Sequence, residues 1–127
     1  MELNGREVKF MYNILASIEI AKLCPDGRLE NIEKLFGNET YEADISSTNK
    51  FMIALNRGYI AAKKAVDPDY DVKELSEDEL MVISNAEYLE LQTEAFEAYK
   101  EGNERHVHTA PVKSKGKKTG TAAKKSS

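Results

Sequence analysis

Hydrophobic residues along the first hundred positions follow two periods, which predict a short hairpin and then helices. Near the start, Val8 and Phe10 alternate with charged residues, as in a strand with one buried face. Asn4-Gly5 tolerates positive φ at both positions, which favours a tight turn before this strand. We therefore expect a hairpin over residues 2–10 and a mostly helical (α+β) fold.

The first helical pattern, over residues 11–23, has apolar side chains on two sides. Two lines recur at helical spacing: Met11, Ile14, Leu15, Ile18 and Ala21, and then Tyr12, Ala16, Ile20 and Leu23. A helix that is apolar on two sides is typical of a central position in the core. Pro25 ends this helix, and a short helix is expected at 29–36.

Polar residues predict where the later helices begin. A helix that reaches about Val66 is expected to be capped by Ser46, Ser47 or Thr48. Gly58 lies inside it and costs ~1 kcal/mol relative to alanine, which indicates close packing at that point.

Two further helices are predicted from pairs with the spacing of a capping box: Ser76 with Glu79, and Ser84 with Glu87. The first pair predicts a short helix over 77–83. The second predicts a longer helix to about Glu101, which Gly102 ends.

The formal net charge of −4 hides a division between two parts of the chain. Residues 103–127 hold seven basic residues and one acid, whereas residues 1–102 hold eleven basic and twenty-one acidic residues. The net charges are therefore +6 and −10. Large apolar residues are absent after Gly102, and such a composition cannot offset its ordering entropy. We expect a compact helical domain over 1–102 and a flexible lysine-rich tail over 103–127.

The residue pattern predicts no catalytic, cofactor-binding or metal site, so we expect a protein that is not an enzyme. Asp67, Asp69 and Asp71 resemble the start of a calcium loop, but Val72 stands where that loop needs glycine. Cys24 is the only cysteine and is expected to pack as a small apolar residue. No apolar run approaches the ~18 residues that span a membrane, and the first residues lack a signal-peptide core. We therefore expect a cytoplasmic location.

The last predicted helix offers the best candidate for a partner-binding surface. Five glutamates form one stripe: Glu87, Glu90, Glu94, Glu97 and Glu101. Like charges at these spacings repel by ~0.2–0.5 kcal/mol per pair, so the stripe is either a docking surface for a basic partner or a solvated face. Four apolar residues on the helix either bind a client or belong to the core: Tyr88, Leu91, Phe96 and Tyr99.

The tail carries six lysines that could contact a polyanion: Lys113, Lys115, Lys117, Lys118, Lys124 and Lys125. Lysine runs attract nucleic-acid phosphates, but this tail has no aromatic residue on which bases could stack. The acidic body would also repel nucleic acid. We therefore expect a loose, salt-sensitive contact between the tail and the glutamate stripe, with no membrane or nucleic-acid partner.

Three stretches of the chain, in order, are LNGREVKFMYNILASIEIAKL, IALNRGYIAAKKAVDPDYDVKELSEDELMVISNAEYLELQTEAFEAYKEG and GKKTG. Together they resemble the tail assembly chaperones of long-tailed phages and prophages of Gram-positive bacteria, over most of residues 3–120. The resemblance implies a cytoplasmic assembly factor without catalytic residues. It would hold the tape measure protein while tail tube protein polymerises around it, and it would be absent from the virion.

The same resemblance implies two further features. Several copies act along one client, so we expect self-association. The family's genes commonly make a longer second product by ribosomal frameshift, and the lysine pairs of the tail are compatible with a slippery adenine run. Two other functions stay open: a structural tail or head–tail protein that remains in the virion, and a small nucleic-acid-binding regulator that acts through the basic tail.

Overall fold

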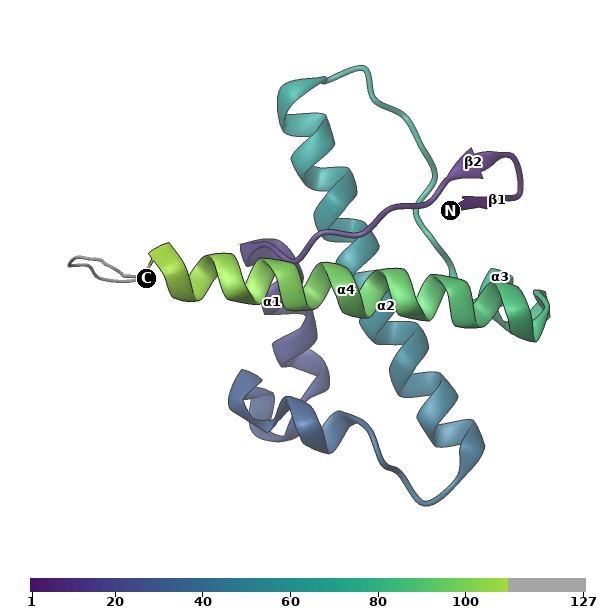
Figure 1. Ribbon diagram of the computed structural model, residues 1–127, viewed down its shortest axis with the longest axis vertical. Helices are drawn as coiled ribbons and strands as arrows, with labels where there is room; N and C mark the ends of the chain where they lie inside the picture. The colour runs from purple at the N-terminus through teal and green to yellow at the C-terminus, as the bar shows by residue number, and fades with distance from the viewer. Residues whose placement is uncertain (110–127) are drawn as a thin grey trace.

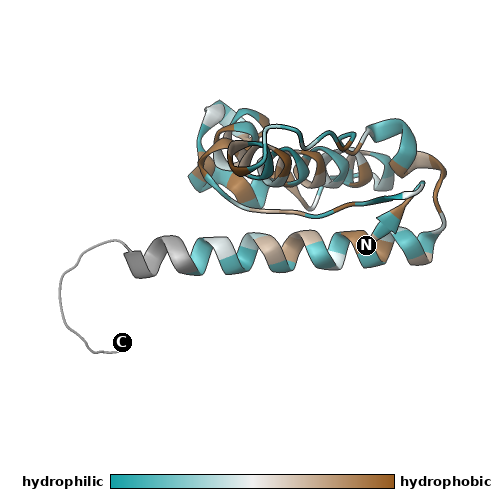
Figure 2. Ribbon diagram, turned by 90° about the horizontal axis from the view of Figure 1, so that it is seen from above, coloured by the Kyte–Doolittle hydropathy of each residue, from teal (hydrophilic) through white to brown (hydrophobic). Residues whose placement is uncertain are grey.

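The computed structural model describes the backbone of residues 1–109 and the side chains of residues 1–104. The elements in chain order are β1 (Glu2–Leu3), β2 (Arg6–Glu7), α1 (Ile14–Leu23), the 3-10 helices η1 (Pro25–Gly27) and η2 (Leu29–Leu35), α2 (Tyr41–Val66), α3 (Glu77–Val82) and α4 (Asn85–Thr109). The fold is mostly helical with a small antiparallel hairpin at the N-terminus, as the sequence predicts. Helix α4 crosses α1 and α2 and forms a separate layer against them (Figures 1 and 2).

The hairpin is shorter than predicted. Only Glu2 with Glu7 and Leu3 with Arg6 pair as strands. Asn4 and Gly5 have φ of 52° and 80°, so the turn forms where the sequence places it. Beyond the strands the chain leaves the two-stranded sheet and runs towards α1, because its partners there are helices.

Helix α1 corrects the prediction of a central helix buried on two sides. Asn13 caps the helix by accepting a hydrogen bond from the Ala16 backbone N–H at 3.1 Å. Ala16 and Ile20 are buried, whereas the line that begins with Ile14 points outward. In a two-layer domain of this size, α1 has neighbours on one side alone, so one of its two apolar faces stays in solvent.

Helix α2 begins earlier than predicted. Its N-cap is Thr40, whose hydroxyl accepts the Ala43 N–H at 3.1 Å, and the helix has 26 residues. The predicted caps Ser46, Ser47 and Thr48 therefore lie inside the helix, and that prediction is wrong. Polar residues are tolerated there because Thr40 and the acidic first turn already stabilise the helix start.

Both predicted capping boxes are present, but Gly102 does not end α4. The helix continues through Gly102 to Thr109, so the prediction of its end is wrong. A Cβ atom on Gly102 would lie 2.6 Å from the Tyr12 carbonyl oxygen. This glycine therefore permits a close approach of two backbones. Residues 110–127, which hold the six tail lysines, lie outside the described residues.

Gly58 of α2 also permits a close approach of two backbones, on the other side of residues 11–13, as the sequence predicts. A Cβ atom there would lie 2.6 Å from the Met11 carbonyl oxygen and 2.7 Å from Asn13 Oδ1. Residues 11–13 thus lie between a glycine of α2 and a glycine of α4. This arrangement fixes the start of α1 between the two long helices.

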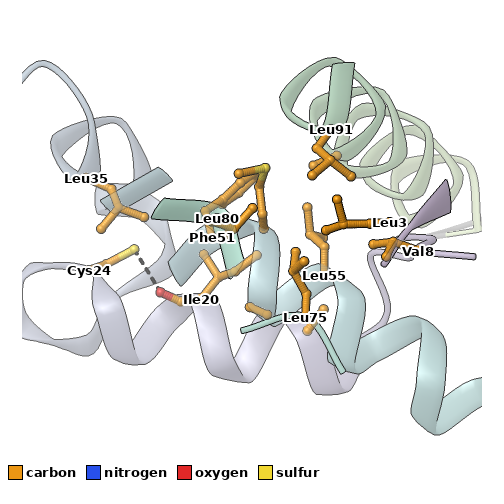
Figure 3. Packing of buried hydrophobic residues seen from close by; sticks show 14 residues of the cluster. Leu3, Val8, Ile20, Cys24, Leu35, Phe51, Leu55, Leu75, Leu80 and Leu91 are labelled. Carbon is orange, nitrogen blue, oxygen red and sulfur yellow. Dashed lines mark hydrogen bonds between the residues drawn. The ribbon is translucent and has the colours of Figure 1, made fainter. Parts of the chain in front are cut away.

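One core joins the hairpin, the long helices and the loop before α3. Its largest fully buried side chains include Ile20, Phe51, Leu55, Leu75 and Leu91 (Figure 3). Cys24 lies at the edge of this core, and its thiol donates to the Ile20 carbonyl at 3.3 Å. The prediction that this cysteine packs as a small apolar residue is confirmed.

Candidate protein-binding surfaces

Asn56, in the second stretch of the resemblance, acts as a structural joint. Its side-chain nitrogen donates to the Lys9 carbonyl at 2.9 Å, and its side-chain oxygen accepts the Leu75 N–H at 2.7 Å. The side chain is buried, so these bonds replace the water that it loses. It therefore ties the N-terminal segment and the loop before α3 to α2.

Arg57 and Tyr59, close to Asn56 on α2, also hold separate parts of the fold together. Arg57 donates to Glu74 at 2.9 Å and to Glu19 at 3.2 Å, which joins α1 and the loop before α3 to α2. Tyr59 lies against the ring of Tyr70, with 6.5 Å between ring centroids. Residues 56–59 therefore help to hold the fold together, because the side chains of Asn56, Arg57 and Tyr59 contact other parts of the protein.

The glutamate stripe runs along α4, and the contacts of Glu87 and Glu94 help to hold the fold together. Glu87 accepts hydrogen bonds from the backbone and hydroxyl of Ser84 at 3.2 Å each, which completes the capping box. Glu94 accepts from the Met1 amine at 3.2 Å. Glu90, Glu97 and Glu101 lie at the surface, as Glu87 does. The repulsion within the stripe is therefore offset in part by these two contacts.

A groove of about 520 Å³ lies between the hairpin and the stripe. Its lining includes Glu7, Lys9, Phe10 and the glutamates at 94, 97 and 101. The Met1 amine lies in it, 2.8 Å from Glu7 and 3.2 Å from Glu94. Burial alone would lower the pKa of this amine, but the two carboxylates raise it above its ordinary value.

The four apolar candidates on α4 face the interior of the protein. Leu91 is fully buried, and Phe96 stacks on Phe51 with 4.8 Å between ring centroids. The centroid of the Tyr99 ring lies 4.7 Å from the centroid of the Tyr12 ring. The structure therefore places these residues in or against the core, which is one of the two interpretations that the sequence allows.

Tyr88 is the fourth of these candidates and has a polar partner. Its hydroxyl donates to Asn49 Oδ1 at 2.7 Å, and Asn49 is fully buried. Burial raises the pKa of Tyr88 to about 12. The contact joins the start of α4 to the middle of α2.

The exposed apolar surface lies elsewhere, and sequence reasoning missed its main part. Ile14, Leu15 and Ile18 of α1 are 66%, 40% and 49% exposed. Other large apolar side chains are exposed at the ends of helices and on α4: Tyr41, Val66, Met81, Val82 and Leu89. The signal that could have found the α1 surface is the presence of two complete apolar lines on a ten-residue helix, since one line suffices for packing.

Within the part of the chain that the structure describes, no group of three or more His, Cys, Asp or Glu side chains is arranged to hold a metal ion. Asp67 Oδ1 instead accepts the Asp69 N–H at 3.2 Å within its own turn. None of the helices formed by residues 1–109 has both the length and the apolar character needed to cross a membrane. The tail lysines and the two histidines lie outside the described side chains.

Comparison with protein-family models, with curated proteins and with solved structures finds no match to this chain.

Proposed function

We propose that this chain is a non-enzymatic tail assembly chaperone of a long-tailed phage. In the host cytoplasm it binds the tape measure protein, an extended and largely helical client, while tail tube protein polymerises around that client. The resemblance of three ordered stretches over most of residues 3–120 supports this assignment.

The observation that carries a binding function is the apolar surface of a small acidic body. Among the described residues, eight large apolar side chains are at least 40% exposed. Single exposed apolar residues are ordinary, but three of these share one face of α1. Several exposed apolar side chains on one helix face offer a surface on which another protein can bury apolar area.

Co-expression with the tape measure and tail tube proteins of the same gene cluster tests the proposal. We expect affinity capture of this chain to retain the tape measure protein, and mass spectrometry of purified particles to lack this chain. Recovery of the chain from particles would instead make it a structural tail protein. Failure to capture the tape measure protein at either low or high salt would contradict the proposal.

A titration with duplex DNA addresses the nucleic-acid alternative. Phosphate contacts by several lysines would make the affinity fall steeply with salt. The chaperone proposal expects no complex at physiological salt, because the −10 body repels the duplex.

A further inference from the structure

The outer face of α1 is apolar over two turns and cationic at its end. Ile14 and Ile18 are one turn apart and Leu15 lies beside them, all well exposed. Lys22 follows Ile18 by four residues on the same row, and its side chain is 70% exposed. Its ammonium lies 3.6 Å from Glu19, whose other contact is with Arg57. The opposite face of α1 already packs in the core through Ala16 and Ile20.

The size of this face argues against a second copy of the chain as its occupant. Burying one aliphatic side chain removes roughly 100 Å² of apolar surface from water, so three partly exposed ones offer less than ~300 Å². A stable dimer typically buries ~800 Å² on each partner.

The charges on the face argue in the same direction. Parallel pairing of two α1 helices would place Lys22 beside Lys22 of the other copy. Antiparallel pairing would place Lys22 beside the N-terminal end of the other α1, which is the positive end of the helix dipole. Neither arrangement supplies a second carboxylate for Lys22, which shares Glu19 with Arg57.

We propose that the outer face of α1 is the docking surface for an amphipathic helix of the client. The apolar stripe of that helix lies on Ile14, Leu15 and Ile18, and a carboxylate of the same helix faces Lys22. Ile14, Leu15 and Ile18 lie on one side of α1 within little more than one turn, so the apolar stripe of a second helix can pack against all three. This inference deepens the proposed function and rests on it for the identity of the client.

The small area of the face has a consequence for how a client is held. One docked helix binds weakly, but a long client that repeats such helices engages many copies of the chaperone at once. Because these copies are not joined to one another, each holds its helix with its own weak affinity and is released singly. That behaviour suits a factor that tail tube subunits must displace.

Two pairs of substitutions test the docking surface. The double variant Ile14→Gln with Ile18→Gln removes the apolar anchors and keeps good helix formers. The control, Val66→Gln with Val82→Gln, removes two side chains that are 81% and 83% exposed elsewhere. We expect the first variant to reduce capture of the tape measure protein at least tenfold and the control to leave it unchanged, with both variants folded by circular dichroism.

A designed peptide tests the chemistry of the face without the tape measure protein. The probe is an amphipathic helix with leucines three and four residues apart and flanking glutamates, and its control has lysines in place of the glutamates. At a salt concentration that screens the field of the −10 body, we expect the first peptide to shift the methyl NMR signals of Ile14 and Ile18 and to bind several-fold more tightly than the second. Lys22→Glu should reverse that preference.

Failure of this inference and failure of the proposed function give different results. If the peptide shifts both methyl signals but the tape measure protein is not captured, the docking surface stands and the proposed function falls. If the tape measure protein is captured equally by the Gln double variant, the function stands and this surface is wrong. Unmoved methyl signals at millimolar peptide, or a wild-type dimer that the Gln double variant dissociates, would each overturn the inference.

Discussion

Replacing Glu79 by glutamine should destabilise the protein at neutral pH, because Glu79 joins α3 to the hairpin through an ion pair. Both terminal guanidinium nitrogens of Arg6, Nη1 and Nη2, donate to its carboxylate at 2.7 Å. The two side chains are only 13% and 12% exposed, and Asn4 adds a third hydrogen bond at 2.8 Å. Glu79 also closes the capping box with Ser76, which glutamine can still do. Glu79→Gln therefore removes the charge and keeps the cap.

The pKa of Glu79 sets the size and the sign of the effect. The Arg6 hydrogen bonds lower it from 4.5 to about 2, against the opposing effect of burial. Each pKa unit is worth ~1.4 kcal/mol, so the ionised carboxylate contributes roughly 3 kcal/mol to the free energy of unfolding. Because the pKa of Glu79 is depressed in the folded state, this contribution is present above pH 4.5 and is lost as the pH falls towards 2. Glutamine retains one acceptor for Arg6, so we expect a loss of about 2–3 kcal/mol at neutral pH.

Urea unfolding followed by circular dichroism measures this, and Glu87→Gln is the matched control. Glu87 closes the other capping box, but it is exposed and its hydrogen bonds come from Ser84. We expect the control to change stability by less than ~0.5 kcal/mol. The gap between wild type and Glu79→Gln should shrink as pH falls from 4.5 towards 2. Equal effects of the two substitutions, or a gap that does not depend on pH, would refute the reasoning.

Four further predictions test individual contacts. Gly102→Ala should cost ~1–3 kcal/mol in urea unfolding, since its Cβ would lie 2.6 Å from a backbone oxygen; an unchanged midpoint would mean that α4 can shift freely. Asn56→Ala should cost ~2–3 kcal/mol by the same assay, because it leaves a buried N–H and a carbonyl unpaired; a neutral result would mean that water replaces the side chain. Tyr88→Phe should cost ~1 kcal/mol and should weaken the loss of stability above pH 10, because the raised folded pKa keeps the neutral phenol favoured up to about 12; identical alkaline profiles would contradict this. Burial raises the pKa of the Cys24 thiol, so we expect a thiol reagent to react at the rate of unfolding, and fast reaction with the folded protein would contradict its burial.

The parts of the fold that the sequence predicts correctly depend on residues close together in the chain. Asn4-Gly5 specifies its turn alone, and Ser76 specifies a helix start together with Glu79 three positions later. Signals of this kind act within one turn of backbone, so neighbouring residues suffice to identify them.

The wrong predictions concern features that distant residues decide. Glycine is typical of a helix end, but Gly102 instead allows the close approach of Tyr12, which is ninety positions earlier in the sequence. The outward face of α1 likewise depends on how many neighbours the helix has. Arg6 pairs with Glu79, which is 73 positions away in the sequence, and no local sequence pattern predicts such a pair. The candidate binding surface is the hardest feature to predict, because the exposure of a side chain depends on how the helices pack in the assembled fold.

Charge also affects how readily the exposed apolar face of α1 can meet a second copy of the chain. The body of residues 1–102 carries −10, so two bodies repel as they approach, and this repulsion opposes contact through α1. A client helix with little net charge meets no such barrier and can bury the same side chains. Salt screens the repulsion between copies but leaves burial of apolar surface largely intact. Sedimentation at rising salt should therefore show any self-association growing while peptide binding to α1 changes little, and the predicted gathering of several copies then follows from the length of the client.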